Sequence, residues 1–157
     1  MPKSHTDIVR AKLKTYSDRG VFRGYSESAG RGSKTMFKFV WLLDREFTLE
    51  FSPDRSTLTM KDILPHVPNR SHMDQDLRTF VQARNEKSLP SHRRVNPKLA
   101  QLTYTNRKEN VSLTMTVKTN QYGRAVTKLL NTTNALFGHL QMAHLPYLWE
   151  HFDVPEE

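Results

Sequence analysis

The chain has 157 residues, of which 36% are hydrophobic and 25% are charged, and its formal net charge is +8. This length is typical of one domain built around one core, so we expect residues 1–157 to form a single domain. Cysteine is absent, which excludes disulfides, thiolate metal sites and a cysteine nucleophile. No apolar run approaches the roughly 20 residues of a membrane-spanning helix, and the start of the chain lacks the apolar block of a secretory signal. We therefore expect a soluble, cytoplasmic protein.

The charge is unevenly distributed along the chain. Residues 1–128 carry all 24 lysines and arginines against 12 acidic residues, a net charge of +12. Residues 129–157 carry four acidic residues and no lysine or arginine, a net charge of −4. A basic body attracts nucleic acid, an acidic protein or a membrane surface, but a solvated surface that maintains solubility is the commoner case.

The first predicted element is a helix over residues 6–19. Ser4 and Thr6 are its candidate N-caps, and Gly20 is the stop signal. The apolar stripe of this helix consists of Val9, Leu13 and Tyr16, widened by Ile8.

Four strands in an antiparallel meander are predicted next. They lie at residues 21–27, 36–43, 46–51 and around Leu58 and Met60. The second is apolar at nearly every position, which is typical of a central strand covered on much of both faces. The third alternates cleanly and follows the short Asp44-Arg45 pair, which suits a tight hairpin loop. Pro53 presets the backbone of the turn before the fourth strand.

A second helix is predicted after Ser71, its N-cap, with Asp74 three residues on favouring the positive end of the helix. Its buried stripe is Met73, Leu77, Phe80 and Val81. A polar, proline-containing loop over residues 85–98 then leads to a hairpin, in which residues 99–105 pair with residues 110–118.

The last predicted helix carries the strongest periodic signal of the chain. Its apolar residues recur at spacings of three and four, at Tyr122, Val126, Leu129, Leu130, Thr133, Leu136, Phe137 and Leu140. The helix is expected to end near His144, because Pro146 cannot continue it. Pro146 is instead expected to open a short turn that docks the following apolar residues, Tyr147, Leu148, Trp149 and Phe152, onto the core.

The order of these elements is α-β-β-β-β-α-β-β-α. Runs of antiparallel strands interrupted by helices predict an α+β fold. We expect one antiparallel sheet, formed by the four-strand meander plus the hairpin, with three helices on one of its faces.

This order resembles the type III secretion chaperone-like fold, in which a helix, a three-stranded meander, a helix, a hairpin and a closing helix form a sandwich. The resemblance covers nearly the whole chain and rests on the patterns above, without a signature motif. It implies a non-enzymatic protein, often dimeric, that binds extended segments of partner proteins; such chaperones tend to be acidic, whereas this chain is basic. Residues 13–21, LKTYSDRGV, are also similar to the start of lipoprotein-carrier-like domains, which implies a curved sheet that holds lipid.

Two groups of residues invite a chemical interpretation that their spacing does not favour. Residues 28–35, SAGRGSKT, resemble a phosphate-binding loop, but Ser33 separates Gly32 from Lys34 and a strand follows, which favours a hairpin loop. His139 and His144 are five residues apart, whereas ligands that share a helical face are three or four apart. We therefore expect no metal site and no cofactor.

No arrangement of acids, bases and nucleophiles predicts an enzyme. Asp74 and Asp76 are two residues apart on a helix and so point in different directions. Ser91 and His92 could be combined with an acidic residue into a catalytic triad, but no nucleophile-elbow motif accompanies them, so the sequence does not support one.

The candidate partner-binding residues lie in and beside the basic loop. They are Arg84, Lys87, Arg93, Arg94 and Lys98, with Glu86 as the only acid among them. The loop has no aromatic residue on which a nucleic-acid base would stack. Core packing is the favoured role of the five strand aromatics, although they could line a ligand groove: Phe37, Phe39, Trp41, Phe47 and Phe51.

These observations favour a non-enzymatic protein-binding module, a chaperone-like adaptor that binds a partner protein through its sheet or dimer surface. We expect it to form a homodimer. Two alternatives stay open: a basic protein that binds nucleic acid, and a carrier of lipid or another hydrophobic ligand.

Overall fold

The computed structural model describes residues 4–84, 100–118 and 120–152. The strands are β1 (Arg23–Ala29), β2 (Thr35–Val40), β3 (Glu46–Ser52), β4 (Thr57–Leu64), β5 (Ala100–Arg107) and β6 (Asn110–Val117). The helices are α1 (His5–Asp18), α2 (His72–Ala83), α3 (Tyr122–Ala143) and α4 (Leu145–His151), with a short 3-10 helix, η1 (Leu42–Asp44).

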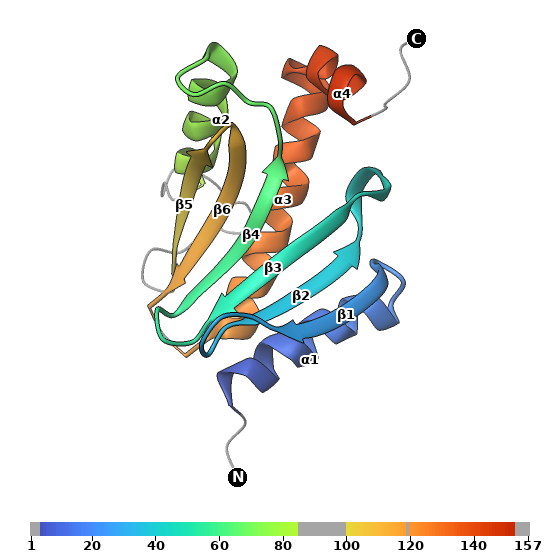
Figure 1. The fold of residues 1–157 in the computed structure, drawn as a ribbon, viewed down its shortest axis with the longest axis vertical. Coiled ribbons are helices and arrows are strands. Elements are labelled where there is room, and N and C mark those ends of the chain that lie inside the picture. The colour runs from blue at the N-terminus through green and yellow to red at the C-terminus, as the bar shows by residue number, and fades with distance from the viewer. Residues whose placement is uncertain (1–3, 85–99, 119, 153–157) are drawn as a thin grey trace.

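The strands form one antiparallel sheet in the order β1-β2-β3-β4-β6-β5. Helices α1, α2 and α3 pack on one face of this sheet, and in Figure 1 the sheet lies in front of α3. The predicted α+β class, the meander and the hairpin are thus confirmed. None of the helices in the described ranges combines the length and apolarity needed to cross a bilayer.

The helix ends follow the predicted caps. The Ser4 hydroxyl accepts a hydrogen bond from the Asp7 N–H at the start of α1, and the Ser71 hydroxyl accepts one from the Asp74 N–H at the start of α2, both at 3.1 Å. Each cap satisfies one of the N–H groups that a helix leaves without a partner in its first turn. Gly20 has a φ of +77°, the left-handed conformation that ends α1 as predicted.

The core lies between α3 and the sheet. The predicted stripe of α3 is buried, and Leu129, Leu136 and Leu140 are completely inaccessible to solvent. Strand residues of the same hydrophobic cluster are equally inaccessible, among them Phe37, Phe39, Leu49 and Phe51. Burial of this many apolar side chains supplies the main stabilisation of the fold.

The structure has a fourth helix where the sequence predicted only a turn. Pro146 stands in the first turn of α4, where its missing N–H leaves no hydrogen bond unmade. Tyr147, Leu148 and Phe152 are buried as expected, and the Tyr147 hydroxyl donates to the Pro65 carbonyl at 2.5 Å. Trp149 is only half-buried.

The second strand is shorter and more exposed than predicted. β2 ends at Val40, and η1 replaces the expected tight loop, with Leu43 and Asp44 at φ values of 53° and 56°. Lys38 in β2 is exposed, while Phe37 and Phe39 are buried. The expectation of two covered faces was wrong because α1, α2 and α3 all pack on the same side of the sheet.

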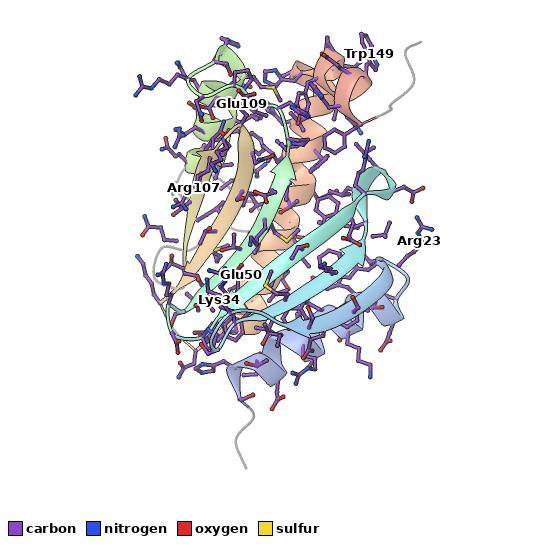
Figure 2. All side chains as sticks on the ribbon, in the orientation of Figure 1. Arg23, Lys34, Glu50, Arg107, Glu109 and Trp149 are labelled. Atoms are coloured by element: carbon purple, nitrogen blue, oxygen red, sulfur yellow. The ribbon has the colours of Figure 1, made fainter. Side chains whose placement is uncertain are left out.

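The other face of the sheet is polar. Threonines of neighbouring strands meet there, and the Thr59 and Thr114 hydroxyls lie 3.2 Å apart. Glu50 pairs with Lys34 at 3.2 Å and with Lys61 at 3.1 Å (Figure 2 shows Lys34 and Glu50). Hydrogen bonds from both lysines hold the pKa of Glu50 below its usual value, although burial acts in the opposite direction.

A buried carboxylate fixes α2 against the sheet. Asp74 is 3% exposed, and its Oδ1 accepts hydrogen bonds from the Tyr104 hydroxyl at 2.7 Å and from the Asn106 amide at 3.0 Å. Its Oδ2 accepts from the Arg70 N–H at 2.9 Å. Burial alone would raise the pKa of Asp74, but these hydrogen bonds lower it. Asp74 thus links α2 to β5, alongside the buried apolar side chains of Leu77 and Val81.

Candidate functional site

Of the predicted basic-loop residues, the structure places one. Arg84 caps the C-terminal end of α2, and its guanidinium lies 4.5 Å from the centre of the Phe80 ring. Lys87, Arg93, Arg94 and Lys98 lie outside the described residues. A role of this loop in binding a partner therefore stays a prediction.

Residues 28–35 form the hairpin between β1 and β2. The Gly30 N–H donates to the Lys34 carbonyl at 2.8 Å, and the Ser33 hydroxyl donates to Asp54 at 2.7 Å. Strand β2 begins at Thr35, so no helix N-terminus is available to hold a phosphate. This agrees with the hairpin that the sequence favoured. Ser91 and His92 lie outside the described residues.

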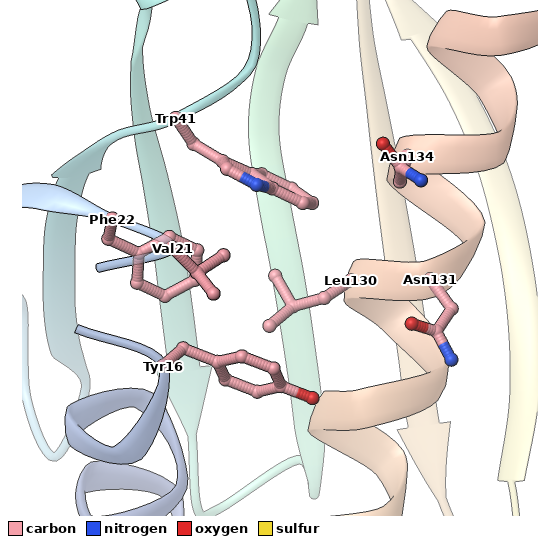
Figure 3. Close-up of a pocket in the computed structure, with 7 residues that line it drawn as sticks. All are labelled: Tyr16, Val21, Phe22, Trp41, Leu130, Asn131 and Asn134. Atoms are coloured by element: carbon pink, nitrogen blue, oxygen red, sulfur yellow. The ribbon is translucent and has the colours of Figure 1, made fainter. Parts of the chain in front are cut away.

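A cavity of about 230 Å³ opens between the end of α1 and the middle of α3. It is lined by Tyr16, Val21, Phe22, Trp41, Leu130, Asn131 and Asn134. Figure 3 shows the rings of Trp41 and Tyr16 on either side of Leu130, with the two asparagines along the adjacent surface of α3. The cavity is thus built from three separate parts of the chain.

Two residues that line this cavity, Phe22 and Trp41, belong to an aromatic cluster. Phe22 stacks on Phe39 with ring centres 4.0 Å apart, and Trp41 meets Phe22 and Phe47 edge-on at 5.6 and 5.5 Å. Val21 at the rim is 42% exposed, which is unusual for an aliphatic side chain in this molecule. Of the five strand aromatics, Trp41 is the one that lines the cavity as well as packing on the core.

A second cavity, of about 250 Å³, lies where α1 meets the start of α3. It is lined by Ile8, Ala11, Lys12, Thr15 and Gly123. Tyr16 of the first cavity follows Thr15 of the second along α1. Its hydroxyl donates to the Thr127 hydroxyl at 3.3 Å, and Thr127 donates to the Gly123 carbonyl at 3.2 Å. We name the two cavities together the α1–α3 groove.

The groove combines apolar floors with polar and basic edges. The Asn131 and Asn134 amides are exposed, and each offers a donor and an acceptor to a main chain. Lys12 lines the second cavity. Two further basic residues are exposed near its lining residues in the sequence: Arg19 lies four residues after Thr15, and Arg124 directly follows Gly123. Each cavity is smaller than the roughly 300–1,000 Å³ of most small-molecule sites, so each suits one apolar side chain better than a lipid.

A second grouping of functional side chains joins α2 to the end of α3. The Asp76 Oδ2 lies 2.8 Å from the His139 Nε2 and 2.6 Å from the His144 Nε2. Hydrogen bonds from His139 and His144 lower the pKa of Asp76, against the opposing effect of burial. Within the described part of the chain, these three residues are the group of histidines and acids whose potential ligand atoms lie close enough to one another to hold a metal ion. We name it the Asp76 cluster.

The sequence argument against this convergence was wrong. Two residues five apart point to different sides of a helix only if the helix continues through both of them. Here α3 ends at Ala143, and His144 has non-helical φ and ψ values of −138° and 40°. The non-helical backbone turns the His144 ring back toward His139, and the two ring centres lie 5.8 Å apart. Pro146 was the available signal for this bend. Asp76, 63 residues before His139, carried no such signal.

The predicted divergence of Asp74 and Asp76 on α2 agrees with the structure. Asp74 and Asp76 point apart, Asp74 to Tyr104 and Asp76 to the histidines. His66 stacks on His151 with ring centres 5.0 Å apart, and His72 is exposed.

Comparisons with protein-family models, with curated proteins and with solved structures found no match for this chain.

Proposed function

We propose that the protein is a non-enzymatic binding module, a chaperone-like adaptor that holds an acidic segment of a partner protein in the α1–α3 groove. The observation that carries the proposal is the pair of cavities along the seam of α1 and α3, each with an apolar floor and a polar edge. The element order, which resembles the type III secretion chaperone-like fold, supports a role of this kind.

The chemistry of the groove indicates the features of the partner segment. Two separate cavities, each lined by residues of α1 and α3, favour a segment with two apolar anchor residues, because buried anchors contribute most of the affinity of an interface. Lys12 and the net charge of +8 favour acidic residues around the anchors. The Asn131 and Asn134 amides suit the main chain of the segment, since each can donate and accept a hydrogen bond.

The first test uses synthetic acidic peptides that carry two leucines at varied spacing. The chain has two tryptophans, Trp41 and Trp149, so the Trp149→Phe variant leaves Trp41 as the only indole. A peptide that enters the groove should shift the emission of Trp41 and raise the anisotropy of a dye on the peptide. Matched peptides with both leucines changed to serine should bind at least about tenfold more weakly, a loss of about 1.4 kcal/mol.

Variants of the protein then locate the site. Val21→Glu places a negative charge at the rim of the first cavity, on a side chain that is already 42% exposed, and should weaken binding at least about tenfold. Met142→Glu adds the same charge at a residue that is 90% exposed and outside the groove, and should leave binding unchanged. Equal affinities of the two variants, or no saturable binding of any acidic peptide, would rule out the proposal.

The same samples distinguish the other partners. Light scattering detects a homodimer, and a labelled oligonucleotide titrated at two salt concentrations detects nucleic-acid binding, whose affinity falls steeply with salt. A dimer that Val21→Glu dissociates would show that a second copy occupies the groove. Oligonucleotide binding without peptide binding would replace the proposed function by the nucleic-acid alternative.

A further inference from the structure

The Asp76 cluster brings one oxygen and two nitrogen ligands to one point from three places in the fold. Asp76 lies in the middle of α2, His139 in the last turns of α3, and His144 between α3 and α4. The three ligand atoms all lie within 4.8 Å of one another. All three side chains are partly accessible, with exposures of 34%, 25% and 12% for Asp76, His139 and His144.

The surrounding contacts hold the rings in place. Phe80, one turn after Asp76 on α2, stacks on the His139 ring at 4.7 Å with an interplanar angle of 21°. The two histidine rings are inclined at 70° to each other, so their Nε2 atoms approach the carboxylate from different directions. The His144 N–H donates to the Leu140 carbonyl at 2.8 Å, which fixes the bend before α4. Ligands whose orientation is set by packing lose little freedom when they bind an ion.

We propose that Asp76, His139 and His144 bind a divalent transition-metal ion of the zinc class. Imidazole nitrogen with carboxylate oxygen is the donor set that zinc, cobalt, nickel and copper accept, whereas magnesium and calcium require mainly oxygen. Three protein ligands leave one position of a zinc tetrahedron for water, and the exposed side of the cluster admits it.

The two distances from the carboxylate oxygen to the imidazole nitrogens require only a small adjustment. Ligands about 2.0–2.1 Å from a tetrahedral zinc ion lie about 3.4 Å from one another. The Oδ2–Nε2 distances of 2.8 and 2.6 Å therefore need to open by less than about 1 Å, which side-chain rotation at partly exposed positions provides. The bound ion would connect α2 to the junction of α3 and α4 and so stabilise the folded chain in proportion to its affinity.

The test uses the whole chain without an affinity tag, freed of metal by a chelator. Zinc chloride titrated by calorimetry should bind at one ion per chain, and cobalt chloride should give the intense visible absorption of a tetrahedral site. Magnesium chloride should not bind. Zinc should also raise the midpoint of thermal unfolding.

Three variants decide whether the ion is at this cluster. His144→Gln and His139→Gln each remove one ligand and should weaken zinc binding by at least about 100-fold, since even changes behind the ligands cost 10–100-fold. His151→Gln is the matched control, because this residue stacks on His66 and is not part of the cluster. It should bind zinc as the unchanged chain does.

Two results would overturn the proposal. The first is an unchanged chain that binds neither zinc nor cobalt, which would leave the cluster as a hydrogen-bonded contact between helices. The second is equal zinc affinity of the His144→Gln and His151→Gln variants. If His144→Gln does not fold, as judged by circular dichroism, the His139→Gln variant and the cobalt spectrum of the unchanged chain decide the question.

Discussion

Replacement of Asp74 by alanine tests whether one buried carboxylate fixes α2 on the sheet. The side chain is 3% exposed and accepts three hydrogen bonds, from Tyr104, Asn106 and the Arg70 N–H. Alanine removes all three acceptor contacts and leaves the Tyr104 hydroxyl and the Asn106 amide in the interior without this partner. The same change removes a buried charge, which partly offsets the loss.

The expected magnitude follows from these contacts. A hydrogen bond to a charged group contributes about 1.5–3 kcal/mol, and removal of one partner from a buried charged network costs about 3–5 kcal/mol in total. We expect Asp74→Ala to lower the free energy of unfolding by about 4 kcal/mol. For a chain of this length that corresponds to a fall of about 10 °C in the midpoint of thermal unfolding.

Urea unfolding followed by far-ultraviolet circular dichroism measures this change, and a double-mutant cycle with Tyr104→Phe locates it. Tyr104→Phe removes one donor at almost constant volume and should cost about 1–2 kcal/mol. The double variant should be more stable than the sum of the single changes predicts, by about 1–2 kcal/mol, because the residues share a contact. A loss below about 1 kcal/mol for Asp74→Ala, or strict additivity, would refute the reasoning.

Three further predictions concern the core, the open face of the sheet and α3. Phe39 is completely buried and stacked on Phe22, so Phe39→Ala should destabilise the fold by about 3–5 kcal/mol in urea unfolding, and a loss below about 1 kcal/mol would contradict the packing. Glu50 has a lowered pKa in the folded state, so its contribution is present above the unfolded value of 4.5 and is lost as the pH falls through the lower folded value. Glu50→Gln should therefore cost about 1 kcal/mol at pH 7 and less at pH 2, and an equal cost at both pH values would contradict the ion pairs. Gly138 lies in α3 with open space around the position of a Cβ atom, so Gly138→Ala should raise the thermal midpoint, stabilising by about 0.5–1 kcal/mol, and destabilisation would show a contact at this site.

Much of the fold could be predicted because its signals are local. The caps at Ser4 and Ser71 are hydrogen bonds within one turn, and the alternation in β3 and β6 reports one buried face of each strand. The sequence failed at β2, where Val40 and the apolar residues after it continued the pattern of a strand. Whether a second face of that strand is covered depends on where the helices pack, which no residue in the strand encodes.

The candidate sites were largely beyond such local signals. The α1–α3 groove is lined by Tyr16, Trp41 and Leu130, which come from three distant segments of the chain. The alternating pattern around Trp41 predicted only that this residue packs in the core, and it gave no indication that Trp41 also lines a cavity. In the Asp76 cluster, the rule for helical spacing gave the wrong answer because His144 lies beyond the helix end.

Composition and pattern by themselves determined the class of fold, the order of the elements from α1 to α3, the stripe of α3 and the absence of thiol chemistry, because each depends on residue type or on neighbours within a turn or a strand. The tertiary structure alone decided which side chains meet across the chain. Asp76 and His144 are brought together by the bend after Ala143 and by the packing of α2 beside α3. Such contacts depend on the relative placement of whole elements, and this placement is set by the core as a unit.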